Sequence, residues 1–250
     1  METPSIKKRK SHQCLEKVFN PDHPHYELGI DEAGRGPLFG RVYTAAVILP
    51  KDNANFHYEW MKDSKKFHST KKIKEVAEYI KEHAVAWSVT YEDEKIIDEI
   101  NILQANFKSM HHAVHNILEN EHELSCILVD GNNFKPYTKF DNKTMRYKSI
   151  PHICIEGGDN KYASIAAASI LAKVGRDNYI EEMCEKHPEL VSYYNIDKNK
   201  GYGTKKHIEG IHEYGISIWH RKTYGICKGA PNAYIPSYAQ LDKNEMNEPT

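Results

Sequence analysis

The chain has 250 residues, of which 40% are hydrophobic and 28% charged, and its 34 basic residues nearly balance 35 acidic ones to a formal net charge of -1. This length is enough for one large domain, and the charge balance excludes a protein that attracts nucleic acid by its net charge alone. No apolar run reaches the roughly 20 residues of a membrane span, and five cysteines without disulfide or zinc spacing favour an intracellular, cytoplasmic protein.

The first segment, residues 1–24, is expected to be a polar tail, because it contains three prolines and shows little hydrophobic periodicity. Its basic run Lys7–Lys10 is either a solvated charge cluster or an arm that contacts phosphate or directs the chain to a nucleus, if the source is eukaryotic or viral. The segment 229–250 is expected to be a second polar tail. One structured domain over residues 25–228 lies between the two.

Between the tails, apolar and β-branched runs predict short strands, and segments of helical periodicity separate them. The predicted strands are 26–30, 41–49, 84–90, 124–129 and 150–155, and the first two form a hairpin. The predicted helices are 70–82, 94–120, 161–174 with an amphipathic continuation to residue 186, and 205–214. Residues 187–200 are expected to form a polar loop.

Four acidic residues lie where three of the predicted strands end. Asp31 and Glu32 follow the first strand inside the glycine-rich segment Gly29–Pro37, Asp130 follows the fourth strand, and Asp159 follows the fifth. The ends of strands are where α/β sheets hold their functional groups. Neighbouring carboxylates repel each other and are costly to desolvate, so a cation is expected beside them. Taken alone, Asp159 has the alternative role of an N-cap or first-turn acid of the helix that follows it.

These carboxylates form an all-oxygen set, with no histidine or cysteine at zinc spacing among them. Oxygen ligands select the hard cations Mg²⁺ and Mn²⁺. Two such ions roughly 4 Å apart activate a water and stabilise the leaving oxyanion in nucleases that hydrolyse phosphodiesters. The lysine clusters of the chain are suited to hold the phosphates. The residues themselves therefore indicate a metal-dependent nuclease.

Eight short motifs, in order along residues 27–225, resemble those of the ribonuclease HII family, the type 2 ribonucleases H. They are GIDEAGRGP (29–37), DSKK (63–66), NILQA (101–105), VDGN (129–132), GD (158–159), IAAASILAKV (165–174), GYGT (201–204) and HR (220–221). One such motif is weak evidence, whereas eight in a common order make the resemblance specific.

The resemblance implies an α/β fold of the RNase H type, with a mixed five-stranded sheet flanked by helices and a helical carboxy-terminal segment. The catalytic domain would span residues 25–228. The resemblance also implies that Asp31, Glu32, Asp130 and Asp159 are catalytic acids that bind two Mg²⁺ or Mn²⁺ ions.

The resemblance further implies how a ribose is recognised. Gly34, Arg35 and Gly36 match the loop whose backbone recognises the 2′-hydroxyl of the ribonucleotide beside the scissile phosphate. The physical logic is that glycine lets a main chain come close to a sugar. The arginine would add a charged fork near phosphate.

Other matched residues are expected around that loop. Tyr202 matches the tyrosine that stacks on the deoxyribose after the ribonucleotide, and its alternative role is that of a turn tyrosine with a free hydroxyl. Lys65 and Lys66 resemble phosphate contacts. The pair His220–Arg221 is either a duplex contact or part of a packed carboxy-terminal corner.

Together these features predict a metal-dependent endoribonuclease that hydrolyses the phosphodiester 5′ to a ribonucleotide, in RNA·DNA hybrids and in DNA with embedded ribonucleotides, leaving 3′-hydroxyl and 5′-phosphate ends. It is expected to be a monomer with no obligate protein partner and no membrane contact. Two alternatives stay open here: a hybrid-binding module that has lost catalysis, and another nuclease of the same fold that cuts DNA. Mg²⁺-dependent cleavage would exclude the first, and an intact all-DNA control the second.

Overall fold

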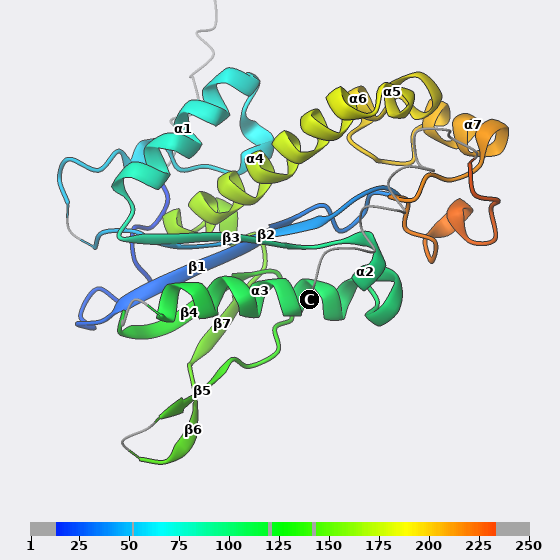
Figure 1. The fold of residues 1–250 in the computed structure, drawn as a ribbon. Coiled ribbons are helices and arrows are strands. Elements are labelled where there is room, and N and C mark those ends of the chain that lie inside the picture. Colours follow the sequence, from blue (N-terminus) through cyan, green and yellow to red (C-terminus); the bar gives the residue numbers. More distant parts are fainter. Residues whose placement is uncertain (1–13, 52, 120–121, 142–143, 234–250) are drawn as a thin grey trace, which may run out of the picture.

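The computed structural model describes residues 14–51, 53–119, 122–141 and 144–233 (Figure 1). Its centre is a five-stranded sheet in the order β3-β2-β1-β4-β7, formed by β1 (Tyr26–Ala33), β2 (Val42–Ile48), β3 (Ala86–Glu92), β4 (Leu124–Asp130) and β7 (His152–Ile155). β1 pairs antiparallel with β2 and parallel with β4, so the sheet is mixed, as the sequence predicted. A separate hairpin of β5 (Thr138–Asp141) and β6 (Arg146–Ser149) has no counterpart among the predicted strands.

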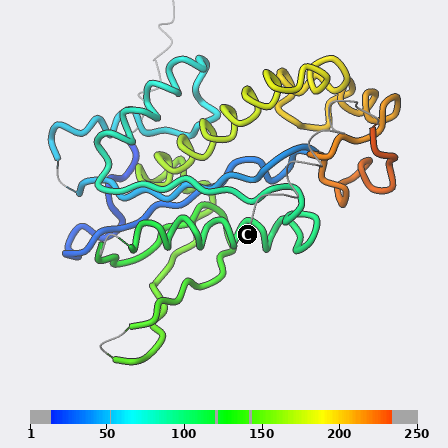
Figure 2. The backbone as a smooth tube through the Cα atoms, in the orientation of Figure 1, coloured from blue at the N-terminus to red at the C-terminus, as the bar shows by residue number. Residues whose placement is uncertain are grey.

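Helices cover both faces of the sheet, as Figures 1 and 2 show. One face carries α1 (Thr70–His83) and α4 (Ala163–Lys186). The other face carries α3 (Ile102–Leu118), which is preceded by the short α2 (Glu94–Ile100). The sheet is therefore buried between two helical layers, and the predicted fold class is confirmed.

The strand β2 contributes to the apolar cores on both faces, and all of its residues are buried. Ala45 and Val47 pack in the core beneath α1 and α4, whereas Ala46 and Ile48 pack in the core beneath α3. Successive side chains of a strand point to opposite faces, so a strand covered on both faces is apolar throughout. The apolar run that predicted this strand reflects that double burial.

The helix α4 packs directly on β1 because small residues lie between them. A Cβ atom on Gly29 would come within 2.2 Å of the carbonyl carbon of Ser164. The helix begins with the run Ala163–Ala168, in which Ile165 is the one large side chain. The small, apolar character of this segment predicted the close approach, and its amphipathic continuation belongs to the same 24-residue helix.

The single helix predicted over residues 94–120 is wrong, because α2 and α3 meet at a break. Asn101 at the break has φ 67°, and its side-chain oxygen accepts hydrogen bonds from the backbone N–H groups of Leu103 at 3.0 Å and Gln104 at 3.2 Å. Asparagine suits both tasks, since it tolerates positive φ and caps helices. Helical periodicity on both sides of Asn101 gives no local signal of the break.

Three short helices extend from the end of α4 and form the carboxy-terminal segment (Figure 1). They are α5 (Pro188–Tyr194), α6 (Ile196–Asn199) and α7 (Lys205–Tyr214). The polar loop predicted over residues 187–200 is therefore wrong. Leu190, Tyr194 and Ile196 are fully buried there in a third apolar core, which stabilises helices too short to form alone.

Part of the predicted amino-terminal tail lies on the domain. The backbone N–H of Glu16 donates to the carbonyl of Lys161 at 2.8 Å. The carboxylate of Glu27 accepts hydrogen bonds from the N–H groups of Phe19 and Asn20, both at 2.6 Å. The basic run at residues 7–10 lies outside the described residues. Of the helices in the described ranges, none is long and apolar enough to cross a membrane.

Candidate active site

The strand register brings two of the four acids together. β1 and β4 are parallel neighbours, and Ile30 pairs with Val129, so Asp31 and Asp130 come next on their strands, side by side. Asp31 is only 5% exposed. Because β1 continues to Ala33, Asp31 belongs to the strand and not to the turn predicted after residue 30. Parallel pairing thus creates an acidic edge at the ends of adjacent strands.

The turn after β7 places the fourth acid. β7 pairs parallel with β4, and the 3-10 helix Gly158–Asn160 that follows it carries the buried Asp159. The N–H of Gly158 donates to Oδ1 of Asp130 at 2.7 Å, which ties this turn to the end of β4. The N-cap of α4 is Tyr162, and the first turn of α4 contains no acid. The helix-capping alternative for Asp159 is therefore wrong.

The acids make one another harder to ionise. Burial raises the pKa of Asp31 well above its usual value, and the charges of Glu32 and Asp130 raise it further. Burial likewise raises the pKa of Asp159, and the charges of Asp63 and Asp130 raise it further. A divalent cation among these groups would offset the repulsion and favour their ionised forms.

The carboxylates are not drawn into a closed cluster. Within the described ranges, no three histidine, cysteine, aspartate or glutamate side chains are close enough to enclose a metal ion. Glu32 pairs with Arg35, whose Nη1 lies 3.2 Å from Oε1 of Glu32, and Nδ2 of Asn160 donates to Oδ1 of Asp159 at 2.8 Å. Repelling carboxylates turn toward such partners. The chemistry of the donor set, oxygen only and mutually repelling, nonetheless fits Mg²⁺ or Mn²⁺.

A cavity of about 520 Å³ opens over the acidic edge. This volume is typical of sites that bind a ligand. The predicted site residues that line it are Asp31, Glu32, Gly34, Arg35, Gly36, Lys65, Asp130 and Tyr202. The structure therefore brings three acids, the glycine loop, one lysine and the tyrosine together, whereas Asp159 and Lys66 are not among the lining residues.

The two predicted lysines occupy different positions. Lys65 lines the cavity, and its backbone N–H donates to Oδ1 of Asp63 at 2.9 Å. Lys66 lies beside the cavity, where its Nζ donates to Oδ1 of Asn160. Asn160 also holds Asp159, so Lys66 is next to the fourth acid through this asparagine.

Tyr202 lies beside the glycine loop. Its side chain is half exposed, and a Cβ atom on Gly36 would lie 3.6 Å from its Cε1. Gly34 has φ 96°, and a Cβ there would come within 2.3 Å of Nε of Arg176. Gly34 is therefore required by the fold, whereas Gly36 has room for a methyl group.

A polar stripe on α4 is not among the predicted site residues. Ser169, Lys173 and Arg176 all line the cavity, and their spacing of four and three residues places them on one face of the helix. Oγ of Ser169 lies 3.1 Å from Oγ of Ser64. A hydrogen bond from Ser169 also partly offsets the rise that burial causes in the pKa of Asp31. The spacing was a usable signal, which the small and apolar character of the helix obscured.

His220 and Arg221 are fully buried, so they are not available to a duplex. The ring of His220 packs against Phe39 and Tyr194, with ring centroids 5.4 and 4.8 Å apart. Of the two predicted roles, the packed corner is correct and the duplex contact is wrong.

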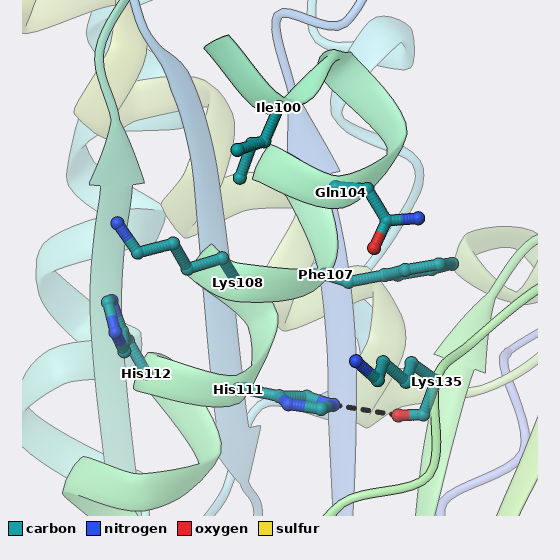
Figure 3. A pocket seen from close by; sticks show the side chains of 7 residues that line it. All are labelled: Ile100, Gln104, Phe107, Lys108, His111, His112 and Lys135. Carbon is teal, nitrogen blue, oxygen red and sulfur yellow. Dashed lines mark hydrogen bonds between the residues drawn. The ribbon is translucent and has the colours of Figure 1, made fainter. Parts of the chain in front are cut away.

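A second cavity, of about 470 Å³, lies along α3 (Figure 3). Gln104 of the NILQA motif lines this cavity and not the acidic one. Two of its side chains contact the carboxylate of Glu92: Nζ of Lys108 lies 3.0 Å from Oε2, and Nδ1 of His112 lies 3.2 Å from Oε1. Glu92 therefore neutralises the charge of Lys108 in this cavity.

Comparison with known proteins identifies the family. Residues 28–225 match the family model described as Ribonuclease HII. The chain belongs to the ribonuclease HII family. Ribonuclease HII of Bacteroides thetaiotaomicron is 45% identical over 200 residues, which cover 80% of this chain and 90% of the relative. That of Endomicrobium trichonymphae is 46% identical over 213 residues, which cover 83% and 91%. The activity of a ribonuclease HII is endonucleolytic cleavage of RNA in RNA·DNA hybrids.

Solved structures show the same fold. Ribonuclease H2 from Pyrococcus horikoshii OT3 is similar with a TM-score of 0.63 at 22% identity, over 89% of this chain and 100% of that chain. The Mn²⁺ complex of Bst-RNase HIII is similar with a TM-score of 0.60 at 16% identity, over 90% and 71%. The RNase H-like architecture predicted for this ribonuclease HII is therefore confirmed.

Proposed function

We propose that this ribonuclease HII hydrolyses the phosphodiester on the 5′ side of a ribonucleotide, both in RNA·DNA hybrids and in DNA with embedded ribonucleotides, and leaves 3′-hydroxyl and 5′-phosphate ends. One observation carries the proposal: Asp31, Glu32 and Asp130 share a single cavity with the loop Gly34–Gly36 and Tyr202. The acids suit phosphodiester chemistry, and the loop and the tyrosine suit recognition of a sugar.

In this proposal Asp31, Glu32, Asp130 and Asp159 hold two divalent ions, Mg²⁺ or Mn²⁺. Such ions act as Lewis acids and lower the pKa of a bound water. The contribution of the chain is to orient the oxygens. The N–H of Glu32 donates to Oδ1 of Asp31 at 2.7 Å, and the N–H of Gly158 fixes Asp130 in the same way. Two of the acids therefore have one oxygen held by the backbone.

Recognition of the ribose rests on the glycine loop. The carbonyl groups of Gly34 and Arg35 are both held by the buried Arg221, so the orientation of these peptide groups is set before a substrate arrives. At Gly36 a sugar can approach the backbone closely because no side chain intervenes. Tyr202 beside it offers a flat face to a deoxyribose that lacks the 2′-hydroxyl.

Basic side chains next to the acids hold the phosphates in this proposal. Arg35 and Lys65 line the acidic cavity, and Lys66 lies beside it. Charged N–H donors bind phosphate oxygens strongly at short range. Because the net charge of the chain is close to zero, these few local cations supply the attraction to the substrate backbone.

The same proposal includes the setting of the enzyme. The acids, the loop and the tyrosine all come from one chain, which supports activity as a monomer with no obligate protein partner. Residues 25–228 would form the catalytic domain between two tails. All five cysteines lie within the described residues and are free, and a bacterial relative is similar along most of its length. Both findings support a cytoplasmic location.

Cleavage of a labelled DNA duplex that contains one ribonucleotide tests the proposal. The duplex is incubated with Mg²⁺, with Mn²⁺ and with a chelator, beside an all-DNA duplex of the same sequence. We expect metal-dependent cutting immediately 5′ of the ribonucleotide and no cutting of the control. Binding without cutting would favour a module that has lost catalysis, and a cut control would favour another nuclease of the same fold.

The pair Tyr202→Ala and Tyr202→Phe tests the recognition of the junction. Loss of the ring should lower cleavage of the single-ribonucleotide duplex by about tenfold more than cleavage of a uniform hybrid, the scale of one stacking contact. The phenylalanine variant keeps the flat face and should retain the preference. Equal losses on both substrates for the alanine variant would count against the stacking role.

A further inference from the structure

We propose that a buried corner formed by His207, His220 and Arg221 positions the two sugar-recognising elements, the loop Gly34–Gly36 and Tyr202, as one unit. The inference rests on the proposed function, since it gives a task to residues that do not line the acidic cavity. These three are positioning residues and not catalytic ones.

Arg221 holds the loop from inside the protein. Its guanidinium is fully buried and donates to the carbonyl of Gly40 through Nε at 2.8 Å, to those of Arg35 and Pro37 through Nη1 at 2.9 Å each, and to that of Gly34 through Nη2 at 2.6 Å. Among the described residues it forms no ion pair within 4 Å with a carboxylate. Four carbonyls of one loop therefore compensate the buried charge, and the loop conformation depends on it.

The two histidines link Ser217 to Tyr202 through a relay of three hydrogen bonds. The hydrogen bond at Ser217 fixes which ring nitrogens carry protons. The backbone N–H of Ser217 lies 3.0 Å from Nδ1 of His220 and can only donate, so Nδ1 accepts and Nε2 of His220 carries the proton. That Nε2 lies 2.9 Å from Nε2 of His207, which must then accept. His207 consequently carries its proton on Nδ1 and donates to the carbonyl of Tyr202 at 3.0 Å.

Both rings are neutral in this relay, because each one donates a hydrogen bond and accepts another. Burial, and after it the neighbouring His207, lowers the pKa of His220 to about 3. Burial lowers the pKa of His207 as well. The carbonyl of Tyr202 therefore has a fixed donor at neutral pH.

Backbone hydrogen bonds join the loop to the tyrosine. The N–H of Arg221 donates to the carbonyl of Leu38 at 2.8 Å, and the N–H of Leu38 donates to the carbonyl of Gly201 at 2.8 Å. Gly201 directly precedes Tyr202. The corner thus contacts both elements, and a direct link joins them. A displacement of the corner would move the backbone that recognises the ribose and the ring that recognises the deoxyribose together.

The variants His207→Gln and His207→Asn separate the two hydrogen bonds of the ring. An asparagine amide reaches the position of Nδ1 and can still donate to Tyr202, whereas a glutamine amide reaches the position of Nε2 and can pair only with His220. The readout is the ratio of kcat/KM on a single-ribonucleotide duplex to kcat/KM on a uniform hybrid. We expect glutamine to lower this ratio by about tenfold and asparagine to keep it within about twofold of the wild type.

Two controls accompany the pair. In a Tyr202→Ala background the glutamine substitution should change the ratio no further, because His207 contacts Tyr202 and would affect the ratio through that ring. His111→Asn disturbs a comparable contact, because Nε2 of His111 lies 2.7 Å from the carbonyl oxygen of Lys135 in the second cavity (Figure 3), and an asparagine amide does not reach the position of Nε2. This variant should leave the ratio unchanged.

Equal ratios for the glutamine and asparagine variants would overturn the inference, as would a further loss in the Tyr202→Ala background. The melting temperatures of both variants are measured in parallel. If the decrease in the ratio followed the decrease in melting temperature and not the position of the amide, the inference would also be overturned. If the wild-type enzyme showed no preference between the two substrates, the proposed junction recognition would be refuted. If the wild type showed the preference and both variants retained it, only the role of the corner would be refuted.

Discussion

Replacement of Asp130 by asparagine should have opposite effects on turnover and on stability. Asparagine keeps an oxygen that can accept the hydrogen bond from the N–H of Gly158, which is 2.7 Å long in the native chain. It removes one negative charge from a crowded site. The pKa of Asp31 is raised by burial and then by Glu32 and Asp130, so removal of this charge relieves a repulsion inside the fold.

The gain in stability can be estimated from the strand geometry. Adjacent strands are about 5 Å apart, so carboxylates at the same level of β1 and β4 are on the order of 5 to 8 Å apart. At an effective dielectric constant of about 20, two unit charges at that separation repel by roughly 2 to 3 kcal/mol. Solvent and partial protonation reduce this repulsion. We expect Asp130→Asn in chelator to raise the free energy of unfolding by about 1 kcal/mol, or the melting temperature by about 2 to 4 °C.

Turnover should change in the other direction. An acid that binds an activating cation contributes several kcal/mol to the rate, so kcat should fall by at least about a thousandfold. Affinity for the hybrid should change by less than about threefold, because it rests on the basic side chains and on the loop.

The assay combines thermal unfolding in chelator and in Mg²⁺ with single-turnover cleavage of a hybrid. Mg²⁺ should stabilise the wild type more than the variant, since a ligand stabilises the folded state that binds it. Glu78→Gln is the matched control: it removes an exposed carboxylate 2.8 Å from Nζ of Lys81 on α1 and should change neither property appreciably. A variant that is less stable than the wild type in chelator, or that keeps near-native turnover, would refute the reasoning.

Three further predictions concern the loop, the carboxy-terminal helices and pH. Gly36→Ala should leave the melting temperature unchanged, since its methyl would lie 3.6 Å from Cε1 of Tyr202, an ordinary contact. The methyl should slow cleavage of a hybrid by about tenfold, because it keeps the sugar from the backbone. A normal cleavage rate would contradict recognition by the backbone. Gly210→Ala should lower the free energy of unfolding in urea by about 1 to 3 kcal/mol, because its Cβ would lie 2.0 Å from the carbonyl oxygen of Tyr193; an unchanged midpoint would contradict that packing. The pKa of His220 is about 3 in the fold against an ordinary 6.5, so the unfolded chain takes up this proton first as pH falls. The stability contributed by the neutral ring is present above pH 6.5 and is lost toward pH 3, by about 1.4 kcal/mol per pH unit. In urea titrations at pH 7, 6 and 5, the free energy of unfolding should therefore decline less steeply for His220→Gln than for the wild type. Parallel declines would contradict the buried neutral ring.

The sequence by itself predicted the five strands of the sheet and four acids beside their ends. Runs of apolar and β-branched residues predict strands, and Asp31 and Asp130 directly follow such runs and lie side by side where the pairing of β1 with β4 ends. These signals are local, because they depend on residues next to one another in the chain. Local signals failed where a single residue changed the backbone, as Asn101 does between α2 and α3, and where tertiary burial stabilised the short helices that replaced a predicted loop.

Only the tertiary structure decided which backbone groups the buried polar residues contact. The hydrogen bonds from Arg221 to the loop join residues 181 to 187 positions apart in the sequence, and no pattern around Arg221 indicates which carbonyls it meets. The pair His220–Arg221 was equally consistent with a surface contact and with a buried corner until burial was known. The cause is physical: the energy of a buried charge depends on the groups that surround it in space, and these come together only when the chain has folded.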